Sequence, residues 1–160
     1  MGIGQQPEAE RGGTLAVVPQ GGCRGRVLVV AEDAAVRRSL VMLLRSSGFQ
    51  PRAFDSAALF LDHALAAAAA GDGAAPCCLL VDHQQPGGMD GLGLVERMAA
   101  AGAGMPAIVI AGEPGPGMRR RAQAAGVIAL VAKPLLDDAV IEAVAEAARR
   151  ARDRAAARPA

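Results

Sequence analysis

The sequence contains no tryptophan, no tyrosine and only three phenylalanines, so aromatic side chains contribute little to any core. Of its 160 residues, 52% are of hydrophobic type, and alanine is the commonest of these. The core must therefore come from a limited set of Val, Leu, Ile and Met side chains. That set is sufficient for one domain of roughly 100–150 residues.

Other scarcities exclude whole classes of protein. The three cysteines, with Cys77 next to Cys78, form neither a disulfide framework nor a CxxC metal pair, which indicates a reducing, cytoplasmic location. Residues 2–8 lack the basic and apolar regions of a secretory signal. The alanine-rich run at residues 64–70 is far shorter than the roughly 20 residues of a membrane span. The net charge of +1 favours neither nucleic acid nor an anionic membrane as a partner.

Composition divides the chain into three parts. Residues 1–25 are rich in Gly, Gln, Pro and Glu and are predicted to be a flexible leader. Residues 26–150 are predicted to form the folded domain. Residues 151–160 are predicted to be a tail, because Ala and Arg with a single Asp are typical of a fraying helix end.

Between the leader and the tail, short apolar runs alternate with helical patterns. The strands are predicted at residues 27–31, 49–54, 77–81, 107–110 and 127–131. Asp33 and Ser56 are placed to cap the first two helices, which end near Gly48 and Gly71. The later helices are predicted at residues 90–101, 118–125 and from 136 to 148. Strands without polar alternation are buried on both faces, so the predicted fold is α/β, a flavodoxin-like doubly wound (βα)5 with a five-stranded parallel sheet.

Charged residues follow three of these strands. Glu32 and Asp33 come after the first strand, Asp82 ends the third, and Lys133 follows the fifth. Ligands of such folds bind beyond the carboxyl ends of the strands. If the first, third and fifth strands lie side by side, three carboxylates and one ammonium converge there. This is a site for a hard divalent cation such as Mg²⁺, and a carboxylate beside Mg²⁺ and a lysine can accept a phosphoryl group.

Each of these residues also has an ordinary structural explanation. Asp33 can be an N-cap, Asp82 a polar residue at a strand end, and Lys133 a solvated side chain. The conjunction of four charged groups at the correct ends of three strands favours the site.

The region from Arg26 to Ala148 resembles the receiver domain of bacterial two-component response regulators. Any one of the matching segments is weak, but together they are specific. They are residues 27–33, 54–57, 78–82, 86–87, 89–92, 106–112 and 125–134.

The resemblance implies a role for each strand-end residue. Asp82 would be the phosphoryl acceptor. Asp33 and Asp82 would ligate Mg²⁺, with Glu32 acting directly or through water and the backbone carbonyl of Gln84 completing the protein ligands. Lys133 would pair with a phosphoryl oxygen, and its bond to the following proline would be cis. A histidine kinase or phosphotransfer protein would be the donor, so the domain would be a signalling module and not an enzyme.

Two positions depart from the family pattern. Ala111 stands where receivers usually carry Thr or Ser, whose hydroxyl bonds the new phosphoryl group, and Leu130 stands where a switching aromatic is usual. The loop after Asp82 is one residue longer than the common pattern, with Gln85 in place of a Met. We therefore expect a domain that takes phosphate but switches weakly, or by another route.

The output of the domain is open at this stage. After Leu136 only one helix and a short tail remain, so we expect a stand-alone receiver without a DNA-binding domain, acting through an unidentified protein partner or as a relay. The alternative is a degenerate receiver that binds partners without phosphorylation. A flavodoxin-like cofactor protein is disfavoured because no phosphate-binding loop follows the first strand.

Two smaller features carry weak signals. The arginines at 119–121 and 149–154 are interpreted as solvated helix faces, because no aromatic residues interleave with them as in nucleic-acid surfaces. His63 and His83 are too far apart in the sequence to indicate a metal site.

Overall fold

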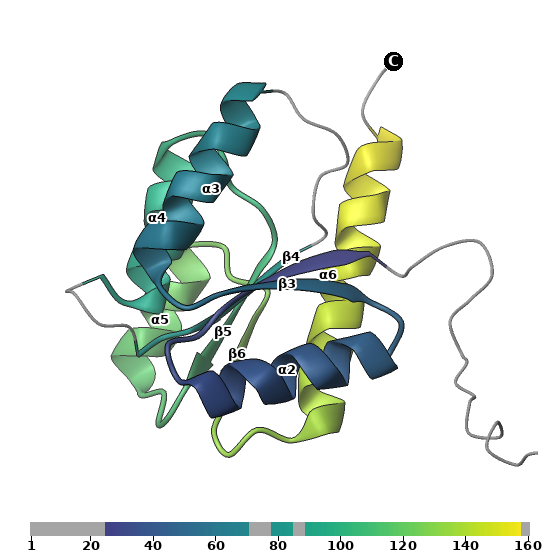
Figure 1. The fold of residues 1–160 in the computed structure, drawn as a ribbon. Helices are drawn as coiled ribbons and strands as arrows, with labels where there is room; N and C mark the ends of the chain where they lie inside the picture. Colours follow the sequence, from purple (N-terminus) through teal and green to yellow (C-terminus); the bar gives the residue numbers. More distant parts are fainter. Residues whose placement is uncertain (1–24, 71–77, 85–88, 158–160) are drawn as a thin grey trace, which may run out of the picture.

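The computed structural model describes residues 25–70, 78–84 and 89–157, and the statements below concern these residues. One sheet of five parallel strands runs through the centre of the domain in the order β3-β2-β4-β5-β6 (Figure 1). The α/β architecture predicted from the apolar runs is confirmed. The strands are β2 (Arg26–Val30), β3 (Gln50–Phe54), β4 (Cys78–Asp82), β5 (Ala107–Ala111) and β6 (Ala129–Ala132).

Helices cover both faces of the sheet, and the alternation of side chains along each strand supplies a core to both (Figure 1). In β2, Val27 and Val29 point to one core, and Leu28 and Val30 point to the other. The first face is covered by α2 (Ala34–Ser46) and α6 (Asp137–Ala157). The second is covered by α3 (Ala57–Ala70), α4 (Gly91–Ala100) and α5 (Pro116–Ala124).

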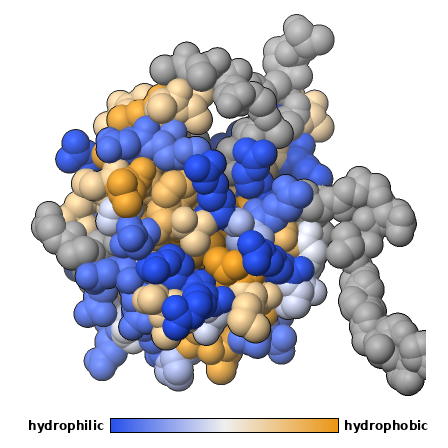
Figure 2. Space-filling view, viewed as in Figure 1, coloured by the Kyte–Doolittle hydropathy of each residue, from blue (hydrophilic) through white to orange (hydrophobic). Residues whose placement is uncertain are grey.

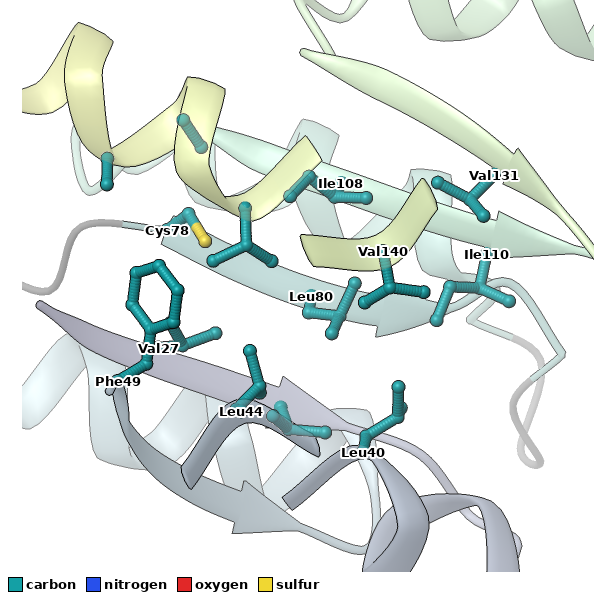
Figure 3. Close-up of a cluster of buried hydrophobic side chains, with 14 residues drawn as sticks. Val27, Leu40, Leu44, Phe49, Cys78, Leu80, Ile108, Ile110, Val131 and Val140 are labelled. Carbon is teal, nitrogen blue, oxygen red and sulfur yellow. The ribbon is translucent and has the colours of Figure 1, made fainter. Parts of the chain in front are cut away.

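The core on the α2–α6 face is built mainly from branched aliphatic side chains, together with Phe49 and Cys78 (Figure 3). Leu40 and Leu44 of α2 and Val140 of α6 lie over Leu80 of β4, and all four are buried. Hydrophilic side chains surround scattered hydrophobic ones on the face seen in Figure 2. The exposed large hydrophobic side chains of the described residues are Met42, Leu59, Leu65 and Leu136.

The first, third and fifth predicted strands do not all lie side by side, so one condition set in the sequence analysis is not met. The first and third predicted strands, β2 and β4, are neighbours, but β5 lies between β4 and the fifth strand, β6. The reason is burial. All five residues of β5 are buried, whereas β6 is mostly half-exposed, so the apolar strand takes an inner position and β6 takes the edge. β3 forms the other edge and contains Pro51, which cannot donate a ladder hydrogen bond.

Several element boundaries also differ from the sequence predictions. α6 continues to Ala157, past the predicted domain end at residue 150, because alanine and arginine are strong helix formers. α5 begins at Pro116, a favoured first helical residue, and not at Met118. β6 begins at Ala129 because the preceding residues close the end of α5, where Gly126 has φ 78°.

Some predictions fall on residues outside the described part of the chain. These are the leader except Gly25, the start of the third strand at Cys77, Gln85 of the loop after β4, and the last residues of the tail.

Replacing a buried core residue should cost far more stability than replacing an exposed one of similar size. We expect Leu80→Ala to lower the free energy of unfolding by about 2–5 kcal/mol, because it leaves a cavity between the sheet and two helices. Met42→Ala, at a side chain that is 71% exposed, is the control and should change it little. Urea unfolding followed by circular dichroism would measure both, since the chain lacks Trp and Tyr. Equal losses in the two variants would contradict the assigned core.

Candidate functional site

A buried carboxylate lies at the carboxyl edge of the sheet. Asp82 is the last residue of β4 and is 4% exposed, and it is the one charged residue classed as buried in the described part of the chain. The ammonium Nζ of Lys133 donates a hydrogen bond of 3.0 Å to Asp82 Oδ2. The backbone amide of Gln84 donates to Asp82 Oδ1, also at 3.0 Å. Both carboxylate oxygens therefore have a donor, as a buried charge requires.

Lys133 reaches Asp82 from a strand that is not its neighbour. It follows β6, and β5 separates β6 from β4. Its backbone amide donates to the carbonyl of Ala111 at 2.9 Å, which attaches the base of the side chain to the end of β5. The long aliphatic stem then spans the end of β5. The Lys133–Pro134 peptide bond is cis, as the family resemblance implied.

Asp33 follows β2 and caps α2, so the structural explanation of this residue is confirmed. Its Oδ1 accepts hydrogen bonds from the amides of Ala35 at 2.8 Å and Val36 at 3.0 Å. These two amides lower the pKa of the Asp33 carboxyl, and the positive charge of Lys133 lowers it further. Asp33 follows β2, the parallel neighbour of β4, so it lies at the same edge of the sheet as Asp82.

Glu32 is exposed, and its backbone carbonyl accepts a hydrogen bond of 3.0 Å from the guanidinium of Arg37. Within residues 25–70, 78–84 and 89–157, no three His, Cys, Asp or Glu side chains are grouped closely enough to hold a metal ion. The roles predicted for Glu32, Asp33 and Asp82 as Mg²⁺ ligands stay predictions. Asp33 and Asp82 suit Mg²⁺, which takes one or two carboxylates and keeps several waters.

The two atypical positions lie beside this edge. Ala111 ends β5 and is 2% exposed, and its carbonyl accepts a hydrogen bond from the amide of Lys133. Leu130 pairs with Val109 in the sheet and packs, half-buried, against the core on the α3–α5 face. A side chain at Gly112 would meet no atom within 4 Å, so there is open space next to Ala111.

The sequence analysis missed one group of charged residues. Arg121 was assigned to a solvated helix face, but its guanidinium bonds the carboxylates of Asp90 and Glu96. Asp90 and Glu96 lie 31 and 25 positions from Arg121 in the sequence, so no local sequence pattern indicates these ion pairs. The only signal in the sequence was the position of Asp90 at the predicted start of a helix, which is where a capping residue stands.

Comparison with known protein families identifies the domain. The family model described as the response regulator receiver domain matches residues 27–145. The chain belongs to this family. Receiver domains are in general signal transducers of two-component systems.

Similar proteins of known name include the transcriptional regulatory protein FixJ of Bradyrhizobium diazoefficiens, which is 34% identical over 80% of this chain and 58% of its own length. Nodulation protein W of the same organism is 33% identical over 80% of this chain and 53% of its own. The chain thus spans about half the length of the curated relatives it matches.

Solved structures agree with the fold. A crystal structure of FixJ-N is similar with a TM-score of 0.67 and 29% identity, covering 78% of this chain and 93% of that one. The response regulator StyR is similar with a TM-score of 0.69 and 32% identity, covering 82% of this chain and 63% of that one. In the described part of the protein, no helix is both long and apolar enough to cross a membrane.

The lowered pKa of Asp33 predicts a contribution to stability that depends on pH. The ionised cap stabilises the fold above the ordinary carboxyl pKa of 3.8, and this stabilisation is lost as the pH falls through the lower pKa of the folded state. Asp33→Asn should keep the cap but remove this part of the pH dependence. Asp33→Ala should remove both.

Urea unfolding of the three proteins between about pH 2 and 5 measures the effect. The same pH profile for the wild type and Asp33→Asn would contradict the assigned shift.

Proposed function

We propose that this receiver domain accepts a phosphoryl group on Asp82 from a histidine kinase or phosphotransfer protein in a two-component phosphorelay. The observation that carries the proposal is the buried Asp82 carboxylate, paired with Lys133 at 3.0 Å at the ligand-binding edge of a doubly wound sheet. In the transfer, an Asp82 oxygen forms a bond to phosphorus. The bond from phosphorus to the donor's imidazole nitrogen breaks, and that nitrogen keeps the electron pair.

The surrounding groups suit this transfer. The amide of Gln84 holds one Asp82 oxygen and so restricts the rotation of the carboxylate. Phosphorylation brings a charge of about −1.5 to −2 to the edge, and the Lys133 ammonium is already there to offset it. Phosphoryl transfer is promoted mainly by positioning and by charge neutralisation, and these residues provide both.

Mg²⁺ is the cation proposed for this site. Asp33, Asp82 and the backbone carbonyl of Gln84 would hold it, with Glu32 acting through a bound water. When bound, the ion neutralises charge on the transferred group and on the carboxylates. We propose a cytoplasmic location and an output through protein–protein contacts, on the grounds of the family and of the cysteine content.

A second candidate is a degenerate receiver that binds its partner without phosphorylation. It is favoured by Ala111, which has no hydroxyl to bond a phosphoryl group although it ends the strand beside Asp82. Leu130, in place of a switching aromatic, points the same way. The two candidates differ in one measurable property, the covalent modification of Asp82.

A small acyl phosphate donor with Mg²⁺ tests the chemistry directly by intact mass. We expect one phosphoryl group on the wild type and on Asp62→Asn, a control at an exposed acid of α3. Asp82→Asn should take none, because the acceptor oxygen is replaced by a nitrogen. No adduct and no Mg²⁺ binding in folded wild-type protein would contradict the proposal and favour the degenerate module.

Restoring a hydroxyl at position 111 should strengthen the conformational response. A hydrogen bond to a charged group contributes about 1.5–3 kcal/mol to stability, and the Ala111 side chain cannot form one. We expect the chemical-shift changes of residues 112–118 on phosphorylation to be larger in Ala111→Thr than in the wild type. Ala111→Val is the control, because valine has nearly the shape of threonine but no hydroxyl. An equal response in the Thr and Val variants would contradict this role of the hydroxyl.

A further inference from the structure

Helices α4 and α5 cover the same face of the sheet (Figure 1), and charged side chains join them. The guanidinium of Arg121, on α5, bonds the Asp90 carboxylate at 3.1 and 3.3 Å and the Glu96 carboxylate at 2.9 and 3.1 Å. Bonds of one guanidinium to two carboxylates define a single geometry more strongly than separate ion pairs do. The hydrogen bonds that Arg121 donates to Glu96 and Asp90 accordingly raise the pKa of Arg121.

Asp90 is itself fixed at the start of α4. It caps the helix, with its Oδ1 accepting from the amide of Gly93 at 2.7 Å. Burial raises the pKa of Asp90, but the bonds from Arg121 and Gly93 outweigh burial and keep the pKa below its usual range. The charged Asp90 carboxylate therefore caps α4 and binds Arg121 of α5 at the same time.

The start of α4 lies directly against the residue that follows the phosphoryl acceptor. The amide of Gly91 donates to the carbonyl of His83 at 3.0 Å. A Cβ atom on Gly91 would lie 2.8 Å from the Cα of His83 and 3.0 Å from the carbonyl of Asp82, so only glycine permits this approach. The Nε2 atom of His83 is 3.6 Å from Asp90 Oδ2.

The same backbone segment is joined to β5. The amide of His83 donates to the carbonyl of Ile110 at 2.7 Å, and Ile110 precedes Ala111 at the end of that strand. The chain runs on from Ala111 into α5, which carries Arg121. The contacts thus form a closed ring from the end of β4 through the start of α4 and Arg121 to α5, and back through β5.

We propose that Arg121 is a positioning residue that couples the Asp82 site to α5, by a route that does not use the hydroxyl absent at position 111. A change at Asp82 displaces His83, which carries the capped start of α4. Arg121 transmits that displacement to α5 through Asp90. The proposal deepens the proposed phosphorylation of Asp82 and rests on it for the signal that is transmitted, but the coupling exists in the unphosphorylated protein.

A double-mutant cycle with hydrogen exchange tests the coupling without phosphorylation. The four proteins are the wild type, Asp82→Asn, Arg121→Gln and the double variant. Asp82→Asn removes the acceptor's charge and weakens its bond to Lys133. We expect it to change the exchange rates of the α5 amides by at least about fivefold, the lower range for coupled sites. In the Arg121→Gln background, the same substitution should change them by less than about twofold.

The readout is the difference between two proteins within each background. If Arg121 had only a structural role, Arg121→Gln would loosen α5 equally with and without Asp82→Asn. The effect of Asp82→Asn on α5 exchange would then be the same in both backgrounds. Arg120→Gln is the matched control, because Arg120 is exposed on the same helix and forms no ion pair with a described residue. Its background should retain the full response to Asp82→Asn. Arg121→Lys should retain part of it.

Two results would overturn the proposal. One is an equal change of α5 exchange in the wild-type and Arg121→Gln backgrounds, and the other is no change in the wild-type background. Failure of the proposed function is recognised separately, as wild-type protein that takes no phosphoryl group.

Discussion

The hydrogen bond between Lys133 Nζ and Asp82 Oδ2 is the contact on which the site depends. A buried carboxylate without partners would be strongly disfavoured, and Lys133 with the Gln84 amide makes its burial tolerable. The bond also joins strands β4 and β6, which do not touch in the sheet. Its geometry depends on the attachment of the Lys133 backbone to the end of β5 through the Ala111 carbonyl. Removal of Lys133 would take away the cation that offsets the buried Asp82 charge, so the fold and the chemistry share one constraint.

The sheet explains why these few residues meet. Parallel strands bring their carboxyl ends to one edge, and β2 and β4 are neighbours where the chain reverses its direction of winding. The neighbouring positions of β2 and β4 are enough to bring Asp33 and Asp82 to the same edge of the sheet. The core below them is mainly aliphatic, with Leu80 and Val140 in one buried cluster on the α6 face, and Phe49 is the one aromatic side chain in that cluster.

Much of this could be predicted from local patterns, and the rest depends on long-range contacts. Apolar runs marked β2, β4, β5 and β6, β3 was only weakly marked, and the position of Asp33 before an amphipathic stretch marked its cap. The place of β5 between β4 and β6 could not be predicted, because strand order depends on comparative burial. Arg121 was missed because its partners are distant in the sequence and only packing of α5 beside α4 brings them together. The role of Glu32 beside Asp33 and Asp82 stays a prediction, because a position in the sequence does not show where a side chain points.

The length of α6 gives the domain a mechanical asymmetry. The helix begins four residues after Lys133, at the edge that carries Asp82, and ends at Ala157. Its 21 residues extend about 31 Å, whereas a five-residue strand spans about 17 Å. Packing from Val140 to Ala151 holds most of the helix on the sheet, and only its last turns, which are exposed, extend beyond this core. Any tilt of α6 at the Asp82 edge is therefore converted into a larger displacement at the far side of the molecule.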